Sequence, residues 1–120
     1  MGRIDKPWGY EKQILITQVD IGDRTGMLGI RKLVINSEEM TSYSYHEEQS
    51  DIIYPEKGNI TLRKDEELEK LEEGNAKIVR KGVRHQIQNI GGDVAEVLEI
   101  SFPYSPEDVV RVEDPYSDQR

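Results

Sequence analysis

The sequence predicts an all-β protein with one domain, built as a sandwich or a barrel. Strand-sized runs rich in apolar and β-branched residues recur along the chain, and turn residues separate them at close spacing. A chain of 120 residues can form one hydrophobic core, and a 35% hydrophobic content with one Trp and one Phe indicates a modest core of Ile, Val and Leu. No internal repeat or low-complexity linker divides the chain, so we expect a single domain over residues 1–120, with looser ends at about 1–5 and 113–120.

The expected strands follow one another from residue 11 to residue 103. The first run is EKQILITQ (11–18), and the turn DIGDRTG (20–26) separates it from MLGIRKLVIN (27–36). The remaining runs are TSYSYH (41–46), DIIYPEKG (51–58), NITLRK (59–64), NAKIVRKG (75–82), HQIQNIGG (85–92) and VAEVLEISFP (94–103). Each run has the length of one strand.

Residues 64–74, KDEELEKLEEG, also fit a short helix. Good helix formers fill this segment, Leu68 and Leu71 are three residues apart, and Gly74 could serve as a C-cap. The alternative is a charged β-hairpin that carries the strand before the segment into LEKLEEG. We favour the hairpin, because strand-like runs lie on both sides. In either case we expect the charges to form a solvated face.

Charge and composition exclude several classes of function. A formal net charge of −8 argues against nucleic acid and against anionic membrane surfaces as partners, because both need clustered Lys and Arg. No apolar run approaches the roughly 20 residues that span a bilayer, and the N-terminal residues lack the apolar stretch of a signal peptide, so we expect a cytoplasmic protein. With no cysteine, disulfides, thiolate nucleophiles and cysteine zinc sites are excluded.

The two histidines of the chain mark the candidate site. In an extended strand His46 and Glu48 point to the same face, whereas Asp51 joins them only if a bulge or a bend intervenes. Gly82 allows a tight turn that would bring His85 onto the following strand. Two histidines and two carboxylates suit Mn, Fe, Ni or Zn. Spacing alone also allows ordinary strand histidines beside an acidic edge.

Two motifs strengthen the metal interpretation. In the first, His46, Glu48 and Asp51 are followed by six residues and Gly58. This arrangement resembles the first cupin motif, which presents His-x-His, an acid, six residues and a Gly.

The second motif begins at Gly74, which five residues separate from RKGVRHQIQN. Gly82, His85 and Asn89 then fall on the cupin pattern. The chain is therefore similar to cupins, which implies a double-stranded β-helix, or jelly-roll barrel. The resemblance also implies a divalent transition metal (Mn, Fe, Ni or Zn) held by residues of both motifs, here His46, Glu48, Asp51 and His85.

Two further segments narrow the resemblance. KPWGYE (6–11) and SPEDVVRVEDPY (105–116) resemble the cupin domain of type II mannose-6-phosphate isomerases, which is also the C-terminal part of bifunctional mannose-1-phosphate guanylyltransferases. The nucleotidyltransferase part has no counterpart here. Glu48 stands where the family usually has its second His, Asp51 replaces a Glu, and Arg80 replaces a Pro. Gln49 stands where type II isomerases usually have Arg, and DII replaces Glu-His-Trp.

The resemblance implies a metal-dependent enzyme that acts on a sugar or sugar phosphate, in the simplest case an aldose–ketose isomerase. The ion would act as a Lewis acid on the substrate oxygen. The candidates for the base that removes the proton are Glu48, Asp51 and Lys81, with Tyr43 and Tyr45 expected mainly to pack on the sheet. The alternatives are a cupin of another reaction class, such as a dioxygenase or lyase, and a non-catalytic sugar- or metal-binding cupin.

A phosphorylated substrate also needs a cation. The candidates for substrate binding are Arg84, Arg111 and Lys6, and further basic residues at 31, 32, 80 and 81 could contribute. We expect Trp8 to anchor the N-terminal segment on the barrel. The cupin resemblance also makes a homodimer plausible, because pairing between subunits protects an exposed edge strand.

Overall fold

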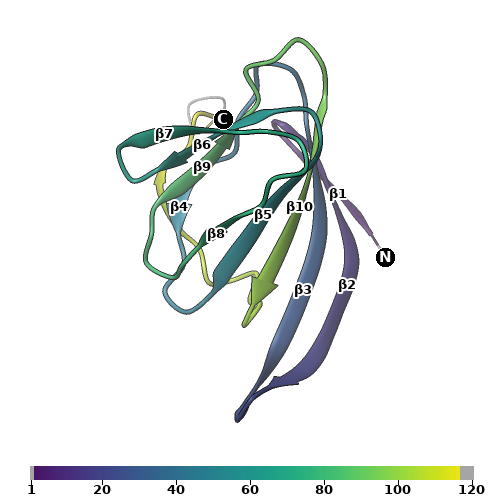
Figure 1. The fold of residues 1–120 in the computed structure, drawn as a ribbon, viewed down its shortest axis with the longest axis vertical. Helices are drawn as coiled ribbons and strands as arrows, with labels where there is room; N and C mark the ends of the chain where they lie inside the picture. Colours follow the sequence, from purple (N-terminus) through teal and green to yellow (C-terminus); the bar gives the residue numbers. More distant parts are fainter. Residues whose placement is uncertain (1, 117–120) are drawn as a thin grey trace.

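The prediction of an all-β fold is confirmed. The structure, a computed structural model, describes residues 2–116, which contain strands and no helix (Figure 1). The strands are β1 (Arg3–Lys6), β2 (Gly9–Ile21), β3 (Arg24–Ile35), β4 (Tyr43–Tyr45), β5 (Ser50–Lys57), β6 (Ile60–Lys64), β7 (Glu67–Leu71), β8 (Lys77–Val79), β9 (His85–Gln88), β10 (Ala95–Phe102) and β11 (Val110–Glu113). Accordingly, the described part of the chain has no helix long and apolar enough to cross a membrane.

Two antiparallel sheets form the jelly roll (Figure 1). One has six strands in the order β1-β2-β3-β10-β5-β8, and the other has five in the order β11-β4-β9-β6-β7. Neighbours in a sheet are mostly distant in sequence: β10 lies between β3 and β5, and β9 lies between β4 and β6. This order brings the segments around residues 46, 51 and 85 to one end of the barrel.

Strands lie close to both ends of the described residues. Residues 3–6 of the N-terminal end pair with β2 as strand β1. At the other end, β11 pairs with β4 and includes Glu113. Met1 and residues 117–120, which belong to the predicted looser ends, lie outside the described residues.

The core forms where the inward faces of the two sheets meet, because alternate residues of each strand point inward. In β10 the residues Ala95 and Val97 are buried, and the intervening positions are more exposed. Trp8 belongs to this core, as predicted. The full set of buried core residues is Trp8, Leu33, Ile35, Ile53, Ile60, Leu62, Leu71, Val79, Ile87, Ala95 and Val97.

The charged segment 64–74 forms the hairpin that we favoured. Strands β6 and β7 pair from Ile60↔Leu71 to Lys64↔Glu67, with Asp65 in the two-residue turn at a φ of 52°. The hairpin buries Leu71 beside the core and leaves Leu68 exposed. A helix would have placed Leu68 and Leu71 on the same face. The hairpin instead buries only Leu71, so packing against the core favours the hairpin over the helix.

Leu62→Ala tests this assignment of the core. Leu62 is 0% exposed, so its truncation leaves a cavity and should lower the free energy of unfolding by about 2–5 kcal/mol. The matched control is Leu68→Ala in the same hairpin, where the side chain is 67% exposed and a change below about 0.5 kcal/mol is expected. Urea unfolding measures both, and equal losses would contradict the assignment.

Candidate metal centre and cavity

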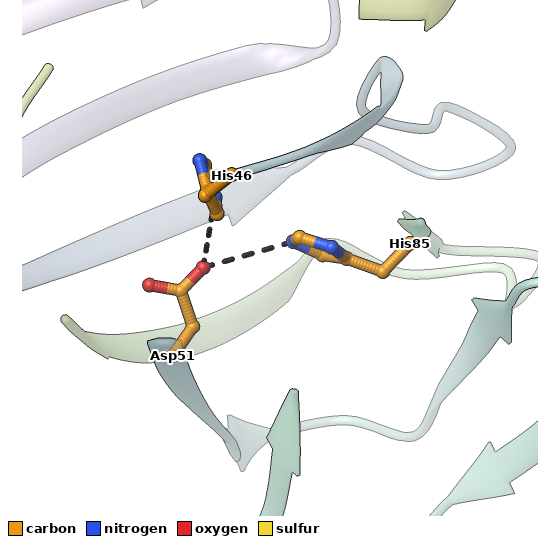
Figure 2. Close-up of side chains that lie close together, drawn as sticks. All are labelled: His46, Asp51 and His85. Carbon is orange, nitrogen blue, oxygen red and sulfur yellow. Dashed lines mark ion pairs between the residues drawn. The ribbon is translucent and has the colours of Figure 1, made fainter. Parts of the chain in front are cut away.

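Three buried side chains converge at one end of the barrel (Figure 2). His46 follows β4, Asp51 lies in β5, and His85 begins β9. The Nε2 atom of His46 lies 3.0 Å from Oδ2 of Asp51, and Nε2 of His85 lies 3.7 Å from the same oxygen. One donor atom from each residue lies within 4.8 Å of the other two. The structure therefore gathers three nitrogen and oxygen donors around one point.

A bend after β4 brings His46 and Asp51 together. The carboxylate of Asp108 accepts hydrogen bonds from the backbone N–H groups of residues 47–49 at 2.8, 2.9 and 2.9 Å, so these residues leave the extended conformation. Asp51 can then lie beside His46, which is the bend that the sequence required for it. The same bend corrects a prediction, because Glu48 is exposed and does not share a face with His46.

The second histidine is placed by a turn that touches the first motif. Gly82 has a φ of 81°, a conformation that favours glycine, and its N–H donates to the backbone oxygen of His46 at 2.7 Å. After this turn, His85 pairs with Ser44 in the β4–β9 ladder. The predicted role of Gly82 as the residue that allows the turn is confirmed.

Backbone carbonyls orient both imidazole rings. Nδ1 of His46 lies 2.5 Å from the carbonyl oxygen of Asp108, and Nδ1 of His85 lies 3.1 Å from that of Val83. When Nδ1–H donates to a carbonyl, the Nε2 lone pair is left free, and both Nε2 atoms face Asp51. Histidines that bind metals commonly have this arrangement.

The carboxylate of Asp51 completes the donor set. Its Oδ1 accepts a hydrogen bond from Nε2 of Gln49 at 2.8 Å, whereas its buried Oδ2 faces the Nε2 atoms of His46 and His85. When both rings are neutral and carry their proton on Nδ1, Oδ2 has no donor among the described residues, and a cation at this point would satisfy it together with the two Nε2 lone pairs. The residues therefore fit a divalent ion that takes nitrogen and oxygen ligands.

Protonation states agree with this geometry. Burial lowers the pKa of His85, which keeps its imidazole neutral. Burial also lowers the pKa of His46, but the hydrogen bond and charge of Asp51 outweigh burial and leave this pKa raised. Burial raises the pKa of Asp51, and its bonds to His46 and Ser101 more than reverse that effect. A proton on His46 and a metal ion would therefore compete for the same carboxylate.

The two histidines line an open cavity of about 670 Å³. Trp8, Leu33 and Ile87 contribute apolar wall, and the segment 104–116 closes one side. Gln49 connects this segment to the metal donors, because its Oε1 accepts the N–H of Ser105 at 3.0 Å. Gln49, which stands where the resembled isomerases usually have Arg, is therefore a structural link in this chain.

A second polar cluster lies in the same cavity, and sequence reasoning missed it. Arg31 in β3 donates to Glu11 in β2 at 3.1 Å and to Glu99 in β10. All three side chains are mostly buried and line the cavity. The alternation of residues along 95–101 could have predicted a buried Glu99. In a strand, Glu99 points to the same face as Ala95 and Val97, which is the inward face.

Burial raises the pKa of Glu99 to about 7, and the neighbouring charge of Arg31 only partly opposes this effect. Arg31 is shared with Glu11, so one cation faces two carboxylates. The charge of Asp51 raises the pKa of Glu99 further. Glu99 is thus a buried carboxyl group that can change its protonation state near neutral pH.

The four remaining basic candidates fall into two groups. Lys6 and Arg111 line the cavity. Lys81 and Arg84 are exposed and are not among the cavity residues. Tyr43 is buried in the sheet, and its hydroxyl group donates to the backbone oxygen of Asp65 at 2.7 Å, which matches the packing role expected for it.

The jelly roll with two histidines and a carboxylate inside one end defines a cupin-type barrel. Residues 33–101 match the cupin domain family, and the chain belongs to this family. The resemblance found in the sequence is thus confirmed at the level of the superfamily.

Known proteins of several kinds are similar to the chain. The tetracenomycin polyketide synthase protein TcmJ of Streptomyces glaucescens is 31% identical over 98 residues, which are 82% of this chain and 64% of that protein. The chain therefore spans less than two thirds of this relative's length.

Solved structures share the fold. KdgF from Halomonas sp. aligns with a TM-score of 0.74 at 17% identity, over 89% of this chain and 90% of that one. A sugar phosphate isomerase of the cupin superfamily from Silicibacter pomeroyi aligns with a TM-score of 0.58 at 19% identity, over 62% and 49%. At these identities the likeness shows the fold alone.

The raised pKa of Glu99 predicts a pH-dependent stability. Because the folded pKa is about 7 and the usual value is 4.5, the folded state binds more protons than the unfolded state between these values. The resulting stabilisation is complete below about pH 4.5 and is lost as the pH rises through about 7. Relative to Glu99→Gln, the wild type should lose about 3 kcal/mol over this range. Urea unfolding at several pH values measures the difference, and parallel stability curves would contradict the assignment.

Proposed function

We propose that this protein is a metal-dependent cupin enzyme that acts on a sugar or sugar phosphate, as an aldose–ketose isomerase similar to mannose-6-phosphate isomerase. The observation that carries the proposal is the convergence of three donors, His46, Asp51 and His85, beside an open cavity. Mn, Fe, Ni and Zn all suit these ligands. Glu48 is left out of the ligand set, because it is exposed on the far side of the bend.

The chain's own residues would perform defined tasks in this reaction. Isomerisation moves a proton between two neighbouring carbons by way of an enediolate, and a bound divalent ion would supply Lewis-acid stabilisation of its negative charge. His46 and His85 would bind through Nε2, while the carbonyls at Nδ1 keep the rings oriented. The segment 104–116 would exclude water from one side of the cavity.

The basic residues that line the cavity could bind a phosphate group. Arg31 is already paired with two carboxylates. Lys6 and Arg111 are therefore the best candidates to bind a phosphate among the cavity residues. The other two basic candidates, Lys81 and Arg84, are exposed, and the proposal does not use them.

Two further expectations stay predictions. Pairing of exposed strand edges would give a homodimer. The protein would be located in the cytoplasm, together with its sugar-phosphate substrate. The proposal depends on neither.

The metal site can be tested by elemental analysis. We expect about one transition metal per chain after loading with Mn, Fe, Ni or Zn in turn, and we expect its loss in His85→Ala, because two of three donors cannot replace the third. Glu48→Gln is the matched control and should keep the metal, because Glu48 lies outside the cluster. Metal that persists in His85→Ala, or disappears in Glu48→Gln, would contradict this ligand set.

The reaction can be tested with mannose 6-phosphate and fructose 6-phosphate. The metal-loaded protein should interconvert them, and in deuterium oxide the product should carry deuterium at the carbon that receives the proton, because the proton is exchanged during enolisation. Proton NMR follows both changes, with the metal-free protein as the control. A metal-loaded protein without any turnover would refute the isomerase and would favour a binding protein.

A second candidate function is the modification of an aromatic polyketide. The relative TcmJ, by its name, belongs to polyketide synthesis, and Trp8, Leu33 and Tyr104 give the cavity apolar and aromatic walls. Trp8 is the single tryptophan of the chain, so its fluorescence reports directly on the cavity. Saturable quenching by the anthraquinone emodin, without turnover of sugar phosphates, would favour this second function.

A further inference from the structure

The bases expected from the sequence do not suit the cavity. Glu48 and Lys81 are exposed and are not among the residues that line it. Asp51 is buried behind the cavity wall and does not line it, and its Oδ2 already faces the Nε2 atoms of His46 and His85. An enzyme that moves a proton next to a carbonyl still needs an acid–base group within reach of the substrate.

Glu99 is placed where such a group is needed. It lines the cavity, and its strand β10 lies beside β5, which carries Asp51. Ser101 is directly opposite Asp51 in this pairing, so Glu99, two residues earlier, is the diagonal neighbour of Asp51 on the inner face. Diagonal neighbours in an antiparallel pair are about 7–8 Å apart, measured between the residues. Glu99 would therefore lie on the same inner face as an ion held by Asp51, and close to it.

Neighbouring side chains hold Glu99 in position. One guanidinium nitrogen of Arg31 donates a hydrogen bond to Glu99, and another donates a hydrogen bond to Glu11 at 3.1 Å. The nitrogen that binds Glu99 also lies 3.4 Å from Oγ of Ser101, which is directly opposite Asp51 in the β5–β10 pairing. Arg31 therefore holds Glu99 beside the candidate metal centre and fixes the direction of its carboxylate.

We propose that Glu99 is the catalytic residue that takes up and returns the proton during enolisation, and that Arg31 and Glu11 are its positioning residues. This inference rests on the proposed function. The ionised carboxylate removes a proton from the carbon next to the carbonyl. The electrons of the C–H bond form a carbon–carbon double bond, and the carbonyl π electrons move to oxygen. The proton on the Glu99 carboxyl group can exchange with solvent at this stage. Glu99 then donates a proton to the former carbonyl carbon, while the hydroxyl proton moves to the other oxygen.

The charged and titratable groups around Glu99 agree with this role. Glu11 in β2 and Arg31 in β3 contact the same cluster, Asp51 in β5 and His46 influence its charge, and Tyr104 stacks with Arg31 at 5.2 Å. The pKa of Glu99, which burial raises to about 7, allows both protonation states near neutral pH. An acid–base catalyst is most effective under this condition.

The first test compares Glu99→Gln with wild type in the fructose 6-phosphate assay, with the protein loaded with Mn²⁺. We expect deuterium incorporation to slow by about 10²–10⁴-fold, with metal content and circular dichroism unchanged. The wild-type rate should rise as the pH passes about 7, and Glu99→Gln should lose this dependence. Glu99→Asp keeps the carboxylate and should restore part of the rate. The matched control is Glu96→Gln, on the outer face of the same strand, which should react like wild type.

A second test does not need turnover. Oxalate is a planar dianion that mimics an enediolate, so its binding to the Mn²⁺-loaded protein above pH 7 should draw about one proton onto Glu99. Calorimetry in two buffers of different ionisation enthalpy measures this uptake, and Glu99→Gln should bind oxalate without it. Proton uptake without sugar-phosphate turnover would support Glu99 and refute the isomerase. Turnover that is unchanged in Glu99→Gln, or equal proton uptake by both proteins, would refute Glu99 and leave the metal site intact.

Discussion

The contacts of Asp108 hold the candidate site together. Its carboxylate caps the N–H groups of residues 47–49, and its backbone oxygen accepts from Nδ1 of His46. Burial raises the pKa of Asp108, but the three N–H bonds outweigh burial and leave this pKa lowered, so the carboxylate stays ionised over a wide pH range. One residue therefore bends the chain, orients a histidine and attaches the segment 104–116 to the barrel.

The bend determines which carboxylate reaches the histidines. Without it, a regular strand would carry Glu48 inward and Asp51 outward. With it, Asp51 is buried between His46 and His85, and Glu48 is exposed. The jelly-roll order of the strands places the second histidine, because β9 lies beside β4 and brings His85 close to His46 and Asp51. Local capping and global topology thus act together on the same three side chains.

The cavity contains more buried acid than one cation can neutralise. Glu11 and Glu99 share Arg31, and Asp51 lies on the neighbouring strand. Such an arrangement destabilises the fold, because desolvated carboxylates repel one another. Active sites accept this destabilisation where the chemistry needs a proton acceptor near neutral pH.

Residues 64–74 fitted a helix as well as a hairpin, and the burial of Leu71 favours the hairpin. The all-β class, the cupin motifs and the histidine pair could be predicted from the sequence alone. These features depend on local patterns of alternation, turn residues and motif spacing, which are visible along the chain. Tertiary contacts bring together the three candidate donors His46, Asp51 and His85, and they also form the Glu11–Arg31–Glu99 cluster. The bend at 46–49 depends on Asp108, about 60 residues away in sequence, and the acidic cluster joins β2, β3 and β10. Neither contact leaves a local pattern, because strand alternation fixes which face a side chain occupies but not which distant side chain it meets.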